Sequence, residues 1–136
     1  MIVADSSYIV EDLLKNKKLL SDDQIVAPEL VVYEVTNAIW KHEHILKDLE
    51  NGEPYLSIFY GFIEAGKITI LSPNERLMQE SYSVAKRNGI TVYNAIFVSF
   101  AIKLGLALRT YDRVQIRVLK SENKHESSLP QRKRVN

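Results

Sequence analysis

Three acidic residues at the ends of predicted elements could form a metal site. Asp5 directly follows the short apolar run 2–4, and Asp112 comes two residues after the run 106–110, which is also predicted to form a strand. If both runs are central parallel strands, the two carboxylates lie at the same edge of the sheet, where α/β folds bind ligands. Each aspartate alone also has an ordinary explanation, Asp5 as a helix cap and Asp112 as a turn residue.

Glu34 is the third acidic candidate. Leu30, Val31 and Ala38 lie four residues before, three before and four after it, so Glu34 borders the apolar face of a predicted helix. One interpretation is a glutamate whose stem covers the core and whose carboxylate reaches water. The other is a carboxylate aimed at a shared polar site, which needs a metal or another partner because an unpaired buried charge is costly.

Clustered carboxylates indicate a hard divalent cation. They repel one another and stay ionised only beside compensating positive charge. Oxygen ligands without sulfur or nitrogen suit Mg²⁺ or Mn²⁺. Such ions activate water, hold the phosphate and neutralise charge on the leaving oxygen, so the acids predict phosphoryl chemistry.

Apolar runs separated by helical patterns predict the elements that position these acids. Strands are expected over 2–4, 24–27, 68–71 and 106–110, and helices over 8–14, 28–46, 54–65, 74–87 and 93–104. Ser6 or Ser7 is expected to cap the first helix. The alternation of residues 114–118 predicts a short edge strand. Strands joined through helices favour a three-layer α/β/α fold with a central, mainly parallel sheet.

We expect one domain over residues 1–120, followed by a polar, basic and mobile tail over 121–136. Residues 120–136 hold five Lys or Arg and two Asp or Glu, a net charge of +3, whereas the whole chain has a net charge of +1. The tail could bind RNA or serve only as a solubilising end, and the sequence favours neither.

Composition excludes several classes of protein. The chain has 136 residues, 46% of them hydrophobic and 26% charged, which is typical of a globular domain. It has no cysteine, which excludes a disulfide scaffold, a thiolate zinc site and a cysteine nucleophile. The first residues do not resemble a signal peptide, and no apolar run reaches the roughly 20 residues of a membrane helix. We therefore expect a soluble cytoplasmic protein.

Two predicted helices, 28–46 and 54–65, carry more aromatic residues than one face of a small sheet can cover. We expect some of them to form a twofold homodimer contact. The residues concerned are Tyr33, Trp40, Phe59, Tyr60 and Phe62.

Four stretches, taken together and in order, resemble the PIN domain family, and most closely its VapC-type toxins of prokaryotic toxin–antitoxin pairs. They are IVADSS at residues 2–7, PELVVYEVTNA at 28–38, GITVYNA at 89–95 and LRTYD at 108–112. The resemblance covers about residues 1–112 and implies an α/β/α fold.

The resemblance also implies an activity and roles for individual residues. Asp5, Glu34 and Asp112 match metal-binding acids, Ser7 and Thr110 match hydroxyl positions near the metal, and Asn37 matches a supporting polar residue. The implied activity is a Mg²⁺- or Mn²⁺-dependent endoribonuclease that leaves 5′-phosphate and 3′-hydroxyl ends. The implied partners are RNA, a second copy of the chain and a VapB-like antitoxin whose tail covers the active groove.

Asn94 departs from the family pattern, because the family usually has aspartate at this position. An amide oxygen can still bind a hard cation, but it carries no charge, so Asn94 is a weaker ligand. This change keeps a second function open, a PIN-fold module that binds RNA or protein with weak or lost nuclease activity. A third alternative is a nuclease acting on DNA, or in RNA processing outside any toxin system.

Overall fold

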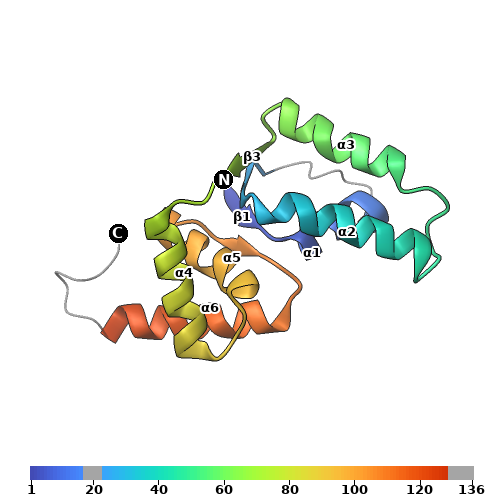
Figure 1. Ribbon diagram of the computed structural model, residues 1–136. Coiled ribbons are helices and arrows are strands. Elements are labelled where there is room, and N and C mark those ends of the chain that lie inside the picture. Colours follow the sequence, from blue (N-terminus) through green and yellow to red (C-terminus); the bar gives the residue numbers. More distant parts are fainter. Residues whose placement is uncertain (17–22, 129–136) are drawn as a thin grey trace.

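The computed structural model describes residues 1–16 and 23–128. Within them, a four-stranded sheet lies among α-helices (Figure 1). The strands are β1 (Ile2–Ala4), β2 (Ile25–Pro28), β3 (Ile68–Leu71) and β4 (Leu108–Arg109). The helices are α1 (Ser6–Glu11), a π-helix (Asp12–Asn16), α2 (Leu30–His44), α3 (Glu53–Glu64), α4 (Glu75–Asn88), α5 (Val92–Leu104) and α6 (Arg113–Ser128).

All strand pairs in this sheet are parallel, in the order β3-β2-β1-β4. The central strand β1 pairs with β2 through Ile2 and Ile25, and with β4 through Val3 and Leu108. The carboxyl ends of β1 and β4 therefore meet at one edge of the sheet. This confirms the predicted α/β class and brings the residues after these two strands together.

Helices cover the sheet from two sides (Figure 1), with α2 and α3 on one side and α4, α5 and α6 on the other. α5 contacts β1 and β2 and is itself covered by α4 and α6. Residues 95–101 of α5 are all buried, because this helix lies between the sheet and other helices. No helix of the described residues is long and apolar enough to span a membrane.

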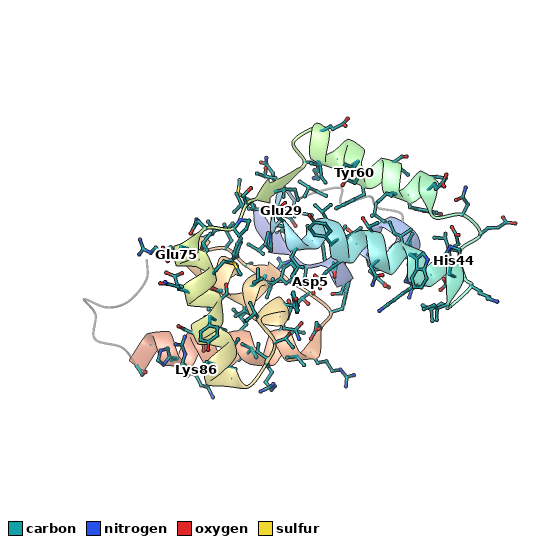
Figure 2. The ribbon with its side chains drawn as sticks, viewed as in Figure 1. Asp5, Glu29, His44, Tyr60, Glu75 and Lys86 are labelled. Atoms are coloured by element: carbon teal, nitrogen blue, oxygen red, sulfur yellow. The ribbon has the colours of Figure 1, made fainter. Side chains whose placement is uncertain are left out.

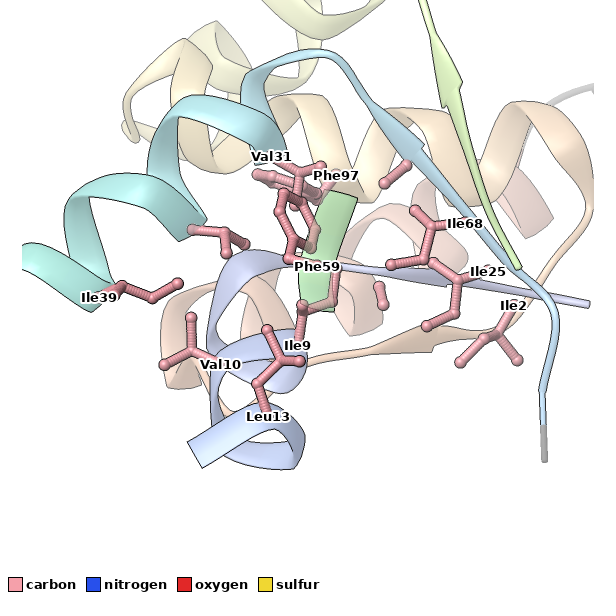
Figure 3. Close-up of a cluster of buried hydrophobic side chains, with 13 residues drawn as sticks. Ile2, Ile9, Val10, Leu13, Ile25, Val31, Ile39, Phe59, Ile68 and Phe97 are labelled. Atoms are coloured by element: carbon pink, nitrogen blue, oxygen red, sulfur yellow. The ribbon is translucent and has the colours of Figure 1, made fainter. Parts of the chain in front are cut away.

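The main core joins the sheet to α1, α2, α3 and α5. Ile2 and Ala4 of β1, which point to the same face, belong to this cluster of buried side chains. Figure 3 shows Val31 of α2, Phe59 of α3 and Phe97 of α5 gathered in it. A smaller cluster joins α4, α5 and α6.

The predicted edge strand over 114–118 is wrong, because these residues begin α6. Val114 and Val118 pack against α4 and α5, whereas Ile116 is 40% exposed. Their spacing of four residues is the helical repeat, and the two-residue alternation is incidental. α6 continues to Ser128, past the tail boundary expected after residue 120, and residues 129–136 lie outside the described residues.

Several other boundaries differ from the expected ones by a few residues. β4 is limited to Leu108–Arg109, shorter than the predicted run 106–110. The first helix begins at Ser6, so Ser6 and Ser7 are not its caps. Its N-cap is Asp5, whose side chain accepts a hydrogen bond from the backbone N–H of Tyr8. A carboxylate at this position also suits the positive end of the helix dipole.

Candidate active site

Asp5 is held by hydrogen bonds from three sides and is only 2% exposed. Its Oδ1 accepts hydrogen bonds from the Ser7 hydroxyl at 2.7 Å and from the Tyr8 backbone N–H at 3.1 Å. Its Oδ2 accepts one from the Thr110 hydroxyl at 2.7 Å. β1 and the turn into α1 therefore supply the carboxylate, and the segment after β4 fixes its orientation.

The segment between β4 and α6 brings Asp112 to the same place. The backbone N–H of Asp112 donates to Thr110 Oγ1 at 2.9 Å, and the N–H of Tyr111 donates to Ser7 Oγ at 3.0 Å. Asp112 Oδ1 accepts hydrogen bonds from the backbone N–H groups of Val114 at 2.8 Å and Gln115 at 3.2 Å. Asp112 thus caps α6 while it faces Asp5.

Glu34 approaches this pair from α2. Its carboxylate is half-buried and hydrogen bonded to the side chain of Ser6. Burial, with the negative charges of Asp5 and Asp112, raises the pKa of Glu34 from 4.5 to about 7. Glu34 is therefore a member of a shared acidic cluster and not simply a solvated residue at the helix edge.

Asp5 experiences the same environment. Burial raises the pKa of Asp5 above its ordinary value, and the negative charge of Asp112 acts in the same direction, against the hydrogen bonds from Thr110, Ser7 and Tyr8. We refer to Asp5, Glu34 and Asp112 as the acidic centre. Figure 2 places Asp5 between the α2–α3 side and the α4–α6 side of the molecule.

Of the predicted site residues, Ser7 and Thr110 are hydrogen bonded to Asp5 of the acidic centre, whereas for two amides no such bond is present among the described residues. Asn94 is half-buried in the first turn of α5, where its backbone N–H donates to Thr91 Oγ1 at 3.3 Å. Asn37 is exposed one turn after Glu34. Within residues 1–16 and 23–128, no hydrogen bond joins either amide side chain to an acid of the centre.

The donor set fits a hard divalent ion in its chemistry, because all three acids offer oxygen and because burial and the charges of Asp5 and Asp112 raise the pKa of Glu34. The positions of these side chains in the structure, however, do not form a complete metal site. Among the described residues, no three His, Asp or Glu side chains are gathered closely enough to hold an ion. Mg²⁺ commonly keeps several waters and uses one or two carboxylates, so a site of this kind needs no closed protein cage.

Sequence reasoning missed two contributors to this site. Ser6, considered only as a helix cap, bonds to Glu34. Tyr111 stacks on Tyr8 with ring centroids 6.0 Å apart and an interplanar angle of 21°. Their positions in the sequence could have identified them, because Ser6 is next to Asp5 and Tyr111 is next to Asp112.

The chain is similar to proteins of one known family. The family model described as "PIN domain" matches residues 2–120 of the chain. The chain is 31% identical over 87 residues to Ribonuclease VapC3 of Pyrobaculum aerophilum, covering 62% of this chain and 63% of that protein. The chain thus spans less than two-thirds of the length of this curated relative.

A solved structure is similar in fold. The crystal structure of PAE2754 from Pyrobaculum aerophilum matches with a TM-score of 0.70 at 18% sequence identity. The match covers 94% of this chain and 96% of that one. At this identity the likeness concerns the fold.

Proposed function

Because the chain belongs to the PIN domain family, we propose that it is a VapC-like endoribonuclease that uses Mg²⁺ or Mn²⁺ to hydrolyse phosphodiester bonds in RNA. The observation that carries the proposal is the acidic centre, where burial, together with the negative charges of Asp5 and Asp112, raises the pKa of Glu34 to about 7. A relative named as a ribonuclease supports RNA as the substrate.

In this proposal Asp5, Glu34 and Asp112 hold the metal, and Asn94 is a weak neutral ligand. The ion, when bound, supplies an activated water and neutralises charge on the phosphate. Ser7 and Thr110 hold Asp5 in one orientation through two hydrogen bonds of 2.7 Å. Glu34, with its pKa of about 7, releases a proton when positive charge enters the centre near neutral pH.

The proposed partners are RNA, a VapB-like antitoxin and a second copy of the chain, together in the cytoplasm. Exposed aromatic side chains on α2 and α3 support the homodimer. Tyr33 is 67% exposed, Trp40 50% and Tyr60 44%, whereas Phe59 is fully buried. Aromatic residues are enriched at the centres of protein interfaces.

A second function is favoured by one observation, the amide at position 94. With Asn94 neutral and no three acids gathered around an ion among the described residues, the chain could be a PIN-fold module that binds RNA or protein. This alternative requires no uptake of Mg²⁺.

The proposed function is tested by cleavage of a labelled single-stranded RNA with Mg²⁺, with Mn²⁺ and with EDTA. We expect cuts with 5′-phosphate ends only when metal is present. Asp5→Asn, which keeps the shape and capping ability of the side chain, is expected to abolish cleavage. Asp48→Asn, at an exposed position in the loop after α2, is the matched control and should cut normally.

Two results would count against the nuclease. One is wild-type protein that binds RNA but leaves it intact with both metals. The other is an Asp5→Asn variant that cuts as fast as the Asp48→Asn control, since that would point to a contaminating nuclease. Calorimetric titration with Mn²⁺ helps to separate the two proposed functions, because the nuclease must take up metal whereas the module need not.

A further inference from the structure

A row of basic residues runs along the exposed face of α6. Arg113, Arg117, Lys120 and Lys124 are all exposed. Their spacing of four, three and four residues places them on one face of the helix. At about 1.5 Å per residue, the row is about 16 Å long. We refer to these four residues as the α6 stripe.

The surface along the α6 stripe is lined by no acidic side chain of the part of the chain that the structure describes. It is an open, shallow hollow of about 550 Å³ formed by α6 alone, and it is lined by the four stripe residues with Ile116 and Ser121. Among the described residues, no ion pair involves a stripe residue. Glu122 of the same helix is buried and paired with Arg87 instead. The stripe therefore keeps its full positive charge for a partner.

Two other basic residues share the carboxylate of Glu80. Between α4 and α5, Lys103 lies 3.4 Å from Glu80, and Arg76 lies 3.5 Å from the same carboxylate. Since the whole chain carries a net charge of only +1, the charge of the α6 stripe is a local feature. Local positive charge of this kind attracts a polyanion.

The α6 stripe starts at the acidic centre. Arg113 directly follows Asp112, whose backbone N–H is bonded to Thr110, and Thr110 holds Asp5. Figure 1 shows α6 extending from this end toward the other end of the molecule. A chain of phosphates lying on the stripe would thus lead to the acids.

An exposed aromatic ring stands at the same end. Tyr111 is 57% exposed, and its ring stacks on that of Tyr8 with centroids 6.0 Å apart. This contact and the hydrogen bond from its backbone N–H to Ser7 hold Tyr111 in place. A fixed, exposed ring beside cationic side chains is the combination that binds unpaired bases and their phosphates.

We propose that the α6 stripe and Tyr111 form a binding track for single-stranded RNA, with phosphates on the stripe and a base on Tyr111. The inference rests on the proposed ribonuclease function and adds how the substrate approaches the acids. An acidic protein segment would match the charge of the stripe, but a fixed, exposed ring beside cationic side chains fits an unpaired base together with its phosphates. The combination therefore favours a single-stranded nucleic acid.

The test measures RNA binding without cleavage. Wild-type protein in EDTA is titrated into a fluorescent single-stranded RNA, and anisotropy is followed at several salt concentrations. The stripe variant Lys120→Gln/Lys124→Gln is compared with Lys67→Gln/Lys86→Gln, which removes two lysines elsewhere, before β3 and in α4. All variants are first checked for unchanged thermal unfolding.

Removal of two phosphate contacts is expected to weaken binding about tenfold or more at 0.1 M salt and to flatten the slope of log K against log salt by about 1.4. The control variant should bind like wild type. Tyr111→Ala should weaken single-stranded RNA binding several-fold with little change of the salt slope, and should leave duplex RNA binding unchanged.

Equal effects of the stripe and control variants would overturn the track, and so would equal loss of single-stranded and duplex binding in Tyr111→Ala. Tight binding of a polyglutamate peptide in competition with the RNA, with no effect of Tyr111→Ala, would assign the stripe to a protein partner instead. The binding track and the nuclease can be refuted independently of each other. Stripe variants that bind and cut like wild type refute the track alone, whereas a wild type that binds through the stripe but never cuts refutes the nuclease alone.

Discussion

The hydroxyl of Thr110 donates a 2.7 Å hydrogen bond to Oδ2 of Asp5, across a sequence separation of 105 residues. The same hydroxyl oxygen accepts a bond from the backbone N–H of Asp112. One side chain therefore connects two acids of the centre that come from opposite ends of the described chain.

Replacement of Thr110 by valine removes this connection while keeping the shape of the side chain. Because buried Asp5 would lose a donor and the Asp112 N–H an acceptor, we expect Thr110→Val to lower the free energy of unfolding by about 1–3 kcal/mol. Thr36→Val is the control, because the Thr36 hydroxyl bonds to Val32 at 2.7 Å on an exposed surface. Urea unfolding compares the two variants. Equal losses in the free energy of unfolding would show that the hydrogen bonds of Thr110 contribute no more to stability than the exposed bond of Thr36.

The pKa of Glu34 predicts how stability depends on pH. Between 4.5 and about 7 the folded protein binds more protons than the unfolded chain, so the free energy of unfolding falls as pH rises through this window. Glu34→Gln should remove most of this fall. We expect it to stabilise the metal-free protein at pH 8 by about 1–3 kcal/mol, below the full value of the shift because Glu34 is only half-buried.

Thermal unfolding from pH 4 to 8 checks the Glu34 prediction. Glu64→Gln, at the exposed end of α3, is the matched control and should follow wild type. Addition of Mg²⁺ at pH 8 should raise the melting temperature of wild type more than that of Glu34→Gln. A melting temperature of Glu34→Gln that falls with pH as steeply as that of wild type would contradict the acidic centre.

Asn94→Asp tests whether position 94 faces the metal. A carboxylate there adds favourable charge beside a divalent ion, although repulsion by the other acids reduces the gain. We expect about tenfold tighter Mg²⁺ binding, equivalent to about 1.4 kcal/mol, and faster RNA cleavage. Asp5→Asn in the same background should remove both gains.

Calorimetry with Mg²⁺ and the cleavage assay measure the effect of Asn94→Asp. Asn51→Asp, in the loop before α3, adds the same charge and keeps an oxygen that can accept from Glu53, as Asn51 does. If both variants tighten Mg²⁺ binding equally, position 94 is not a ligand. If Asn94→Asp binds more tightly and still cuts nothing, the module function replaces the nuclease.

Glu122 joins α6 to α4 and should contribute to stability. It is 5% exposed and accepts hydrogen bonds from Arg87 Nη2 at 2.6 Å and Asn88 Nδ2 at 2.9 Å. Burial alone raises the pKa of Glu122, but these bonds outweigh it and hold the pKa below 4.5. The contribution is therefore present above pH 4.5 and lost as pH falls through the lowered pKa.

We expect Glu122→Gln to lower the free energy of unfolding by about 1–3 kcal/mol at pH 7. The loss should shrink in acid, where wild type also loses the charge. Glu11→Gln breaks the exposed pair with Lys15 at 3.5 Å, and should cost less than about 0.5 kcal/mol. Urea unfolding at pH 7 and pH 3 distinguishes the two variants. If Glu122→Gln lowers the free energy of unfolding equally at both pH values, the charge of Glu122 makes no contribution.

The exposed aromatic residues of α2 predict assembly. We expect light scattering to give a dimer at micromolar concentration and Trp40→Glu to give a monomer, because a charge at the centre of an interface is strongly unfavourable. Tyr82→Glu changes an aromatic residue of α4 that is 62% exposed, and it should stay dimeric. A wild-type monomer would contradict the homodimer.

The sheet and the acidic centre were predictable because they depend on short-range patterns and a topological rule. Buried strands that are apolar on both faces were visible as continuous runs, as in β1 and β2. The strand-end rule then brought Asp5 and Asp112 together. The hydroxyl network was not predictable from these patterns, because it requires the register of β1 on β4.

α6 was missed because polar residues form part of its buried face. Gln115 is 3% exposed and Glu122 5%, whereas apolar Ile116 is 40% exposed. A prediction based on hydrophobicity alone places Gln115 and Glu122 on the surface and Ile116 in the core. The cap at Asp112, with two backbone N–H groups on one oxygen, marks the helix start, but a lone aspartate is equally typical of a turn.

The pairing of β1 with β4 has a consequence for folding. β1 is the first strand and lies in the middle of the sheet, and one of its two neighbours is the last strand of the described chain. This long-range pairing closes a large loop and is slow to form compared with local contacts. An N-terminal fragment that carries Asp5 and Glu34 but lacks β4 has neither the third acid nor the hydroxyl of Thr110. The proposed chemistry of the acidic centre therefore requires the sheet to close first, so the order of folding would itself delay the proposed activity.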